Sequence, residues 1–583
     1  MKPKQRTIHF PDGTTAKVYP EDGALPAPKA PERNRKRVLG MVAAAIILGA
    51  LLLAIAARAD VVMGGPPQPY IMMSRDGVAQ EISPEGHAEV EIHGPASPFG
   101  EVIVTNLEPA IQNDFIYGSS TENFRYVNYG GASTSTSLNM LVVQTGAQQN
   151  SMSAVTTRRS AKYRPGQGTV SYFAGMFSTA TTGSNQFAGL GSGEAAIGFG
   201  TLDDKFGIYF ASGNYREVQT LVINTKSSND QVATVTLAGQ TFTCQVSNGA
   251  NAAATAWEIA NSTETTCDFK TKVPGWFAEA KGSSVTFIAS TGGNQTGTMD
   301  ISFPTSGSGS FTETIQGAIG TTEFIPQASW NMDTMDGSKA SGSTTNPSGF
   351  SMDYTKGNVF RLKLQYLGFG DIEFGVEDAN TGELNTVHRL KLASARSSPT
   401  LSNPNFSFAI SAQNTTGSSV MTTKMSSLSA FIAGTKAELG RQRNFRKYTT
   451  GIGTTFVPII SIRNPRMFRG RPNQIELLFR EMTVANLGLK GLEFAVVRDP
   501  KLNNTASFVS LDTGTGMEYD TSATSYTGGS EQDGGAVGNS NTVIQDLHGH
   551  QVSLAPGDVV SFVARSVATT TDISVSIQVI EDR

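Results

Sequence analysis

The residues best placed to do chemistry are an aromatic ring and three carboxylates in one Asp-rich region. Trp330, Asp333 and Asp336 lie in the run WNMDTMDG, and Asp353 follows a short distance later. Clustered carboxylate oxygens suit a hard cation such as Ca²⁺, and a tryptophan face suits the apolar face of a sugar ring. The same residue types are also typical of a turn between strands, where Asp and Gly serve the backbone. The region therefore predicts either a patch for a glycan or cation, or an ordinary turn.

Two further sets of polar side chains could support catalysis or metal binding. Glu373 and Glu377 share one face of an expected strand, with Asp378 beside them, as on the solvated face of a strand. Glycoside hydrolysis would need two carboxylates facing each other across a groove. His548 and His550 share one side of an extended segment, but two imidazoles without a nearby Cys or a third His make an incomplete metal site. We interpret both histidines as polar loop residues.

The common catalytic signatures are missing from the sequence. It has no Gly-Lys dipeptide for a phosphate-binding loop, no GxSxG elbow and no HExxH helix. A formal net charge of -4 and a pI near 6.0 give no general attraction to nucleic acid. We expect a protein that is not an enzyme and has no catalytic residue, cofactor or metal.

The chain has two cysteines, Cys244 and Cys267. They could form one disulfide if this part of the chain faces an oxidising compartment, or they could be two partly buried thiols. Because the spacing is not that of a Cys-x-x-Cys redox pair, a stabilising role is favoured over redox chemistry.

A basic cluster stands out in the C-terminal third of the chain. Its members are Arg441, Arg443, Arg446 and Lys447, together with Arg463, Arg466, Arg469 and Arg471. Few aromatic residues are interleaved with them, which argues against stacking of single-stranded nucleic acid. Contact with an acidic neighbouring subunit and a merely solvated face are the two interpretations.

Short strands must position these residues. The 583 residues include 61 glycines, with 16% charged and 38% hydrophobic residues, and long amphipathic helical runs are scarce. Runs such as GTVSYFAGMFS and FGIYFAS alternate with a period of two and are bounded by Gly, Ser, Asn and Asp. This pattern predicts antiparallel sandwiches of the jelly-roll or lectin-like kind, so that the fold class outside one apolar run is mainly β.

The apolar run is VLGMVAAAIILGALLLAIAA, residues 38–57, and it has the length of a single transmembrane helix. Basic residues come immediately before it, namely Arg33, Arg35, Lys36 and Arg37. This concentration of basic residues before the run predicts an N terminus on the cytosolic or interior side of the membrane. The alternative is a cleaved signal peptide, because Ala57-Arg58-Ala59 has the small-x-small spacing of a cleavage site.

We expect six segments along the chain. They are a basic polar segment (1–37), the transmembrane helix (38–57), a spacer (58–98), a first β-sandwich (99–434), a basic linker (435–447) and a second β-sandwich (448–583). Within the first sandwich, residues at about 219–320 form a small α+β insertion. The insertion is indicated by the hairpin pattern VATVTLAGQTFTCQV, followed by AAATAWEIANST, which is typical of one short helix.

Several spaced motifs occur in one order beyond Gly100, namely AKYRPGQG, WNMDTMDG, TVHRLKLA, PIISIRN and LAPGDVVSFVARS. In this arrangement the chain resembles virion structural proteins, minor capsid or surface β-sandwich proteins of large DNA viruses and tailed phages. The resemblance implies a particle component without enzymatic activity. The apolar run is not expected in a structural protein of a tailed phage that has no membrane, but it fits a structural protein of a virus with an internal membrane.

Two functions follow from these patterns. The first is a membrane-anchored minor structural protein of a virus particle, a single-pass protein that links a lipid bilayer to capsid proteins of the same particle and could form homo-oligomers. The alternative is an outward-facing viral adhesin or lectin-like spike that binds host glycans. A compact patch of aromatic and carboxylate side chains would separate the two, and the region of Trp330 is the candidate.

Overall fold

The structure is a computed structural model that describes residues 107–583 except 249–250, 262–265, 339–344, 435–439 and 550–551, together with four short N-terminal strands. These strands form two hairpins, β1 (Arg6–His9) with β2 (Thr15–Val18) and β3 (Met72–Met73) with β4 (Ala79–Gln80). The expected transmembrane run and the basic residues before it lie outside the described residues. Among the residues described, no helix is both long and apolar enough to cross a membrane.

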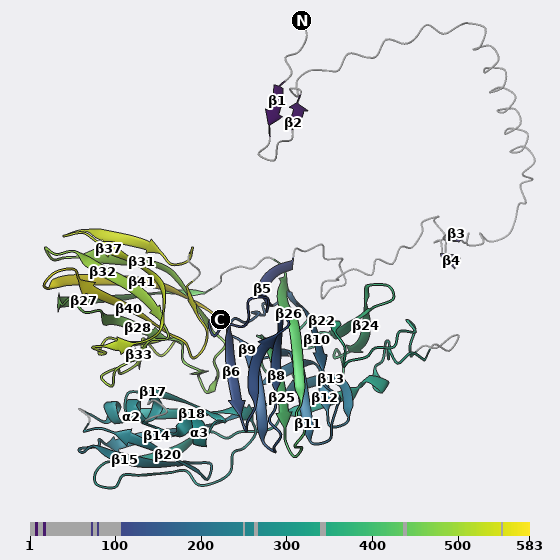
Figure 1. Cartoon of the computed structure of the whole chain (residues 1–583), viewed down its shortest axis with the longest axis horizontal. Helices are drawn as coiled ribbons and strands as arrows, with labels where there is room; N and C mark the ends of the chain where they lie inside the picture. Colours follow the sequence, from purple (N-terminus) through teal and green to yellow (C-terminus); the bar gives the residue numbers. More distant parts are fainter. Residues whose placement is uncertain are drawn as a thin grey trace, which may run out of the picture. The chain divides into compact units, whose positions relative to one another are not determined.

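The first β unit has two antiparallel sheets that share one core (Figure 1). The eight-stranded sheet contains β7 (Ser133–Ser137), β8 (Met140–Gln144), β26 (Thr422–Ala433), β10 (Gly168–Phe177), β22 (Asn358–Leu364), β23 (Ile372–Asp378) and β24 (Glu383–Leu390), with β5 (Leu107–Asp114) beside β26. The seven-stranded sheet contains β6 (Phe124–Tyr129), β9 (Ser151–Thr157), β25 (Ser407–Asn414), β11 (Ser184–Gly191), β12 (Ala195–Leu202), β13 (Lys205–Ser212) and β21 (Thr321–Pro326).

Phenylalanines at alternate positions join these two sheets. Phe173 of β10 and Phe360 of β22 come from the eight-stranded sheet, and Phe199 of β12 comes from the seven-stranded sheet. The ring centroids of Phe199 and Phe360 are 4.7 Å apart and those of Phe173 and Phe360 are 5.1 Å apart. All three rings are buried, so the two-residue period directs them into one apolar layer.

An α+β insertion interrupts this unit, as the sequence predicts. Its four-stranded sheet contains β17 (Trp276–Lys281), β18 (Ser284–Gly292), β14 (Arg216–Thr225) and β20 (Ser308–Ile315). Its three-stranded sheet contains β16 (Gln240–Val246), β15 (Gln231–Leu237) and β19 (Asp300–Ser302), and its helices are α2 (Ala252–Asn261) and α3 (Phe269–Lys272). The predicted short helix is confirmed by α2, which packs on the strands through Ala256 and Ile259.

The C-terminal β unit also has two sheets around one core. The first sheet contains β27 (Arg441–Ile452), β41 (Thr571–Asp582), β31 (Glu476–Asn486) and β38 (Thr542–Asp546), with β39 (Ser553–Leu554) beside β31. The second contains β34 (Val509–Ser510), β35 (Glu518–Asp520), β28 (Val457–Arg463), β40 (Val559–Ser566), β32 (Leu492–Arg498) and β37 (Ser530–Val537). In the first sheet β41 pairs on both sides, with β27 and with β31.

The mainly β fold class with antiparallel sheets is confirmed, and one segment differs from expectation. Residues 441–447 were expected in a basic linker, whereas the structure places Arg441–Ile452 in strand β27. Phe445 supplies a buried apolar anchor, and the flanking charged side chains keep this edge strand hydrated. Such charges hide the alternating pattern from which a strand is normally predicted.

Candidate functional site

A hollow of about 680 Å³ lies where the first β unit, the insertion and the C-terminal unit meet. The described residues from 107 onward form one compact unit, so these three parts contribute to the hollow together. Its floor is the outward face of the seven-stranded sheet, and its walls come from the insertion and from loops of the C-terminal unit. Thr121 and Asp499 are exposed to solvent and mark the rim.

Small side chains explain why the floor is hollow. Ala154 of β9 is paired with Ser411 of β25, and Ser411 is in turn paired with Phe187 of β11. One pair further along β25, Ala409 faces the same way as Ser411 and also lines the hollow. Because the side chains at these outward positions are small, they leave the space above the sheet unfilled.

An aromatic ring borders this floor. Phe187 of β11 lines the hollow and is half-buried, and its ring is held edge-on to Tyr209, with ring centroids 5.8 Å apart. Tyr126 of β6 pairs with Val155 and packs against the core of the first unit, so its ring faces away from the floor. An aromatic ring beside small side chains suits a ligand with an apolar face.

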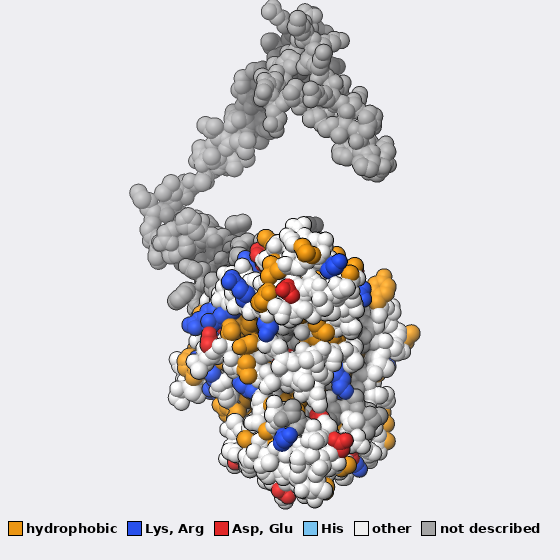
Figure 2. Space-filling model, turned by 90° about the vertical axis from the view of Figure 1, so that its left-hand side faces the viewer, with side chains coloured by type: hydrophobic (Ala, Val, Ile, Leu, Met, Phe, Trp, Pro, Cys, Tyr) orange, Lys and Arg blue, Asp and Glu red, His pale blue; other side chains and the backbone are white. Residues whose placement is uncertain are grey.

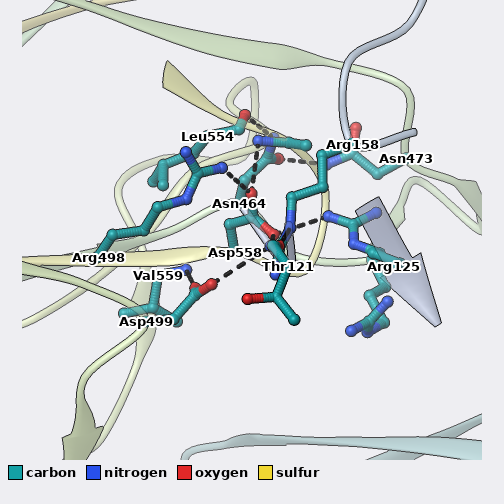
Figure 3. Close-up of polar contacts among 12 residues, drawn as sticks. Thr121, Arg125, Arg158, Asn464, Asn473, Arg498, Asp499, Leu554, Asp558 and Val559 are labelled. Carbon is teal, nitrogen blue, oxygen red and sulfur yellow. Dashed lines mark hydrogen bonds and ion pairs between the residues drawn. The ribbon is translucent and has the colours of Figure 1, made fainter. Parts of the chain in front are cut away.

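A buried carboxylate joins the first and the C-terminal units at one side of the hollow. Asp558, whose side chain is fully buried, accepts hydrogen bonds from Arg125 at 2.8 Å, from Arg498 at 2.7 Å and from Arg158 (Figure 3). The Ala555 backbone N–H donates to the same carboxylate at 3.2 Å. Burial opposes ionisation of Asp558, but attraction to the three guanidinium groups outweighs it and lowers the pKa below its ordinary value.

A network of amides fixes the loop that carries this aspartate. The Asn464 backbone N–H donates to the Asp558 carbonyl oxygen at 3.0 Å, and the Asn464 side chain donates to the Leu554 carbonyl oxygen at 2.9 Å. The Asn473 amide donates to the Asn464 side-chain oxygen at 2.7 Å (Figure 3). These hydrogen bonds fix the loop of Asp558 in addition to the contacts of its carboxylate with the arginines.

Two other arginines line the hollow from different parts of the chain. Arg216 begins strand β14 of the insertion, and Arg466 follows strand β28 of the C-terminal unit. Arg466 pairs with Glu279 at 3.3 Å and lies over the Phe277 ring, 4.4 Å from its centroid. Burial, together with repulsion from Arg125, lowers the pKa of Arg466 to about 10. Burial also lowers the pKa of Arg216, against the attraction of Glu194 and with further repulsion from Arg125.

The Asp-rich region that the sequence singled out lies elsewhere, in the first unit. Trp330 is only 3% exposed, and its ring packs in the core against Phe199 and Phe206 at centroid distances of 6.0 and 6.2 Å. No face of this indole is open to a sugar. The turn interpretation describes this region better than the sugar-stacking one.

The three aspartates of that region serve the backbone. Asp333 accepts hydrogen bonds from the Met335 and Ser348 N–H groups at 3.0 and 3.1 Å. Asp336 and Asp353 each accept from the N–H two residues later, at 2.8 and 2.9 Å. Within the described residues no three His, Cys, Asp or Glu side chains are grouped as a metal site.

The other carboxylates are also placed outside the hollow. Glu373 is paired with Arg389 and Lys363 on the outward face of β23, which Glu377 shares. The Asp378 side chain is 2% exposed and accepts the backbone N–H of the turn residue Asn380.

Each histidine of the HGH sequence is placed differently. The backbone N–H of His548 donates to Asp546 at 3.0 Å, in the loop that follows β38. His550 lies outside the described residues.

The remaining singled-out residues are the cysteines and the basic cluster. Cys244 and Cys267 form a disulfide inside the insertion. In β27, Arg443 pairs with Asp512 at 3.0 Å, while Arg441 and Arg446 are exposed. Lys447 is half-buried on the same strand. An intramolecular partner therefore accounts for one of the four basic residues on β27.

Of the residues that build the hollow, the sequence singled out Arg466 as part of the basic cluster, but it did not single out Asp558 or Arg125. Asp558 occurs in LAPGDVVSFVARS, where only the strand pattern was visible, and its partner Arg125 is 433 positions away. An acidic residue directly before a long apolar strand was the available signal, because such a residue is buried with the strand only if it is paired.

Comparisons with known proteins add little to this geometry. No protein-family description and no curated protein matches the sequence. In structure the chain is similar to arcelin-5, a lectin-like defense protein from Phaseolus vulgaris, at 8% identity and a TM-score of 0.21 over 56% of this chain and 99% of that one. It is similar to a Bauhinia forficata lectin in complex with GalNAc at 8% identity and a TM-score of 0.20, over 56% and 99% of the two chains.

An engineered GH43 glycoside hydrolase is similar at 9% identity and a TM-score of 0.19. That match covers 62% of this chain, which spans about half (48%) of the hydrolase chain. These TM-scores are low, so the argument about function rests on this chain's own residues.

Proposed function

We propose that the chain is a non-enzymatic glycan-binding protein whose ligand occupies the hollow between the three β units. The observation behind the proposal is the composition of the hollow: half-buried Phe187 beside the small floor residues Ala154 and Ala409, with polar side chains around them. A sugar places an apolar ring face on an aromatic side chain and exchanges hydrogen bonds through its hydroxyl groups.

The size of the hollow suits such a ligand. Small-molecule sites usually enclose about 300–1,000 Å³, and this hollow has about 680 Å³. Polar side chains from all three units, among them Thr156, Ser290 and Gln474, are distributed around it and can bond hydroxyl groups.

The carboxylates in the hollow favour binding without cleavage. Glycoside hydrolysis needs one carboxylic acid with a raised pKa that can protonate the leaving group. Asp558 has the opposite shift, because three arginines hold it ionised. Asp499, the other acidic residue of the lining, lies 3.3 Å from Arg158. Neither carboxyl group is arranged as a general acid.

A role as a surface adhesin of a virus particle, the alternative that the sequence indicated, is part of this proposal. The disulfide between Cys244 and Cys267 suits an oxidising exterior. Attachment by residues 38–57 and contacts with capsid subunits stay predictions, because that segment lies outside the described residues. Protease treatment of intact particles, followed by mass spectrometry of the released peptides, distinguishes an exterior spike from an internal tether.

Binding is tested with the full chain, purified in a mild detergent, on an array of neutral and acidic oligosaccharides. Ala409→Leu fills the floor of the hollow and is expected to reduce glycan binding at least tenfold. Ala174→Leu is the matched control, because Ala174 faces outward on β10 of the opposite sheet and should leave binding unchanged. The proposal fails if the wild-type chain retains no oligosaccharide of either class, or if the two variants bind equally well.

A further inference from the structure

The lining of the hollow has an excess of positive charge. It contains four arginines, Arg125, Arg158, Arg216 and Arg466, against two acidic residues, Asp499 and Asp558. Four positive and two negative charges leave a surplus of two positive charges within the lining, which contains no lysine, glutamate or histidine. Behind the lining, Glu279 pairs with Arg466, Glu194 attracts Arg216 and Arg498 pairs with Asp558, so a surplus of one positive charge remains. A hollow that accepted only uncharged groups would gain nothing from this surplus, because burying like charges together is unfavourable.

The two aspartates do not compensate all four arginines. Asp558 is engaged by Arg125 and Arg158, and also by Arg498 from behind the lining. Asp499 lies beside Arg158 at the rim, with 41% of its side chain exposed. Both acidic groups are therefore engaged by arginines other than Arg216.

Arg216 is paired with neither aspartate, and its hydrogen-bonding capacity is not fully used. Its buried Nε has no hydrogen-bond partner among the described residues. Its guanidinium lies against the Gly193 backbone, where an added Cβ would lie 2.8 Å from Nη2. Gly193 thus leaves the space that the guanidinium occupies at the wall of the hollow.

Arg466 reinforces the positive potential at the same place. Repulsion between Arg466, Arg125 and Arg216 contributes to the lowered pKa of Arg466, and Glu279 and Asp558 oppose that effect only in part. A bound anion would relieve the repulsion and would also give Arg216 the acceptor that its Nε lacks.

We infer that the glycan bound in this hollow carries an oxyanion group, a carboxylate or a sulfate or phosphate ester, which Arg216 and Arg466 receive. This inference rests on the proposed function. A guanidinium donates two parallel hydrogen bonds to two oxygens of such a group, which a neutral sugar hydroxyl cannot accept in the same way.

The selectivity arises within the hollow rather than from a broad basic surface. On the face shown in Figure 2, Lys and Arg side chains are scattered, with Asp and Glu among them. The whole chain has a formal net charge of -4, so general attraction to polyanions is weak.

The test compares matched pairs of oligosaccharides on the array, each neutral glycan beside its uronic acid, sulfated or phosphorylated counterpart. We expect at least one acidic member to bind the full chain about tenfold or more tightly than its neutral partner. Arg216→Met should abolish that preference. Arg565→Met is the control, because Arg565 pairs with Glu493 outside the lining of the hollow.

A second measurement does not depend on the folding of any variant. Binding of the preferred acidic glycan to the wild-type chain should weaken as NaCl rises from about 0.05 to 0.5 M, because salt screens the partly exposed arginines. Equal binding of neutral and acidic partners, or binding that salt leaves unchanged, would overturn the inference and leave the proposed function intact. Failure of every glycan to bind would overturn both.

Discussion

Replacing Asp558 by Asn should uncouple the first β unit from the C-terminal unit. The substitution keeps the shape of the side chain but removes the negative charge that Arg125, Arg158 and Arg498 share. These arginine side chains are 15–23% exposed, so water replaces the lost carboxylate only in part. Breaking a buried ion pair by removal of one partner costs about 3–5 kcal/mol, and we expect Asp558→Asn to fall in that range.

Hydrogen exchange locates this loss better than a single melting temperature, because several packed units need not unfold in one step. We expect reduced protection in β6, which carries Arg125, and in β40, which follows Asp558. Asp512→Asn is the matched control, since Asp512 is 44% exposed where it pairs with Arg443. An exposed pair contributes about 0–1 kcal/mol.

The pH dependence provides an independent measure of the same contact. Because the folded-state pKa of Asp558 lies below that of an unfolded aspartate, its contribution is fully present above about pH 4 and is lost as the pH falls through the folded-state pKa. Asp558→Asn should remove this part of the acid sensitivity. If Asp558→Asn and Asp512→Asn lose the same small amount of stability, the buried carboxylate does not join the units and the reasoning is refuted.

Three further predictions concern stability. Burial lowers the pKa of His388 to about 4, below its ordinary 6.5. The unfolded chain therefore binds the proton at a higher pH than the folded chain, and the stability of the fold should decrease as the pH drops from 6.5 to 4. His388→Gln should make the melting temperature less dependent on pH in this range. Reduction of Cys244–Cys267, a separation of 23 residues, should cost the insertion roughly 3 kcal/mol. The loss of stability should be seen as faster hydrogen exchange in α2 after reduction, and unchanged exchange would contradict this prediction. Gly189→Ala should lower the free energy of unfolding by about 1–3 kcal/mol, because its Cβ would collide with the Ile197 carbonyl oxygen; a denaturant midpoint equal to that of wild type would refute this.

The fold was largely predictable because it depends on local signals. Alternation along residues 358–390 predicts the meander of β22, β23 and β24, with its turn at 378–382. Helix α2 and the two sandwiches follow from the same periodicities. Strand β27 was hidden because its side chains are mostly charged, and a charged edge strand resembles a linker in sequence.

The site was not predictable for a different reason. Asp558, Arg125 and Arg216 come from three units, and nothing in the local sequence records which distant charges they meet. Conversely, the Trp330 region has the composition of a sugar site, but the Trp330 indole is buried in the core of the first unit, where it packs against Phe199. Residue type alone does not distinguish these cases, because exposure is decided by tertiary packing.

The position of β41 in its sheet constrains the order in which the chain can fold. This strand, Thr571–Asp582, separates β27 from β31, although both are made earlier. Until it is synthesised, two long strands expose unpaired backbone edges that can join other chains. The C-terminal unit, and with it the wall of the hollow that contains Asp558, can therefore assemble only after β41 has been synthesised.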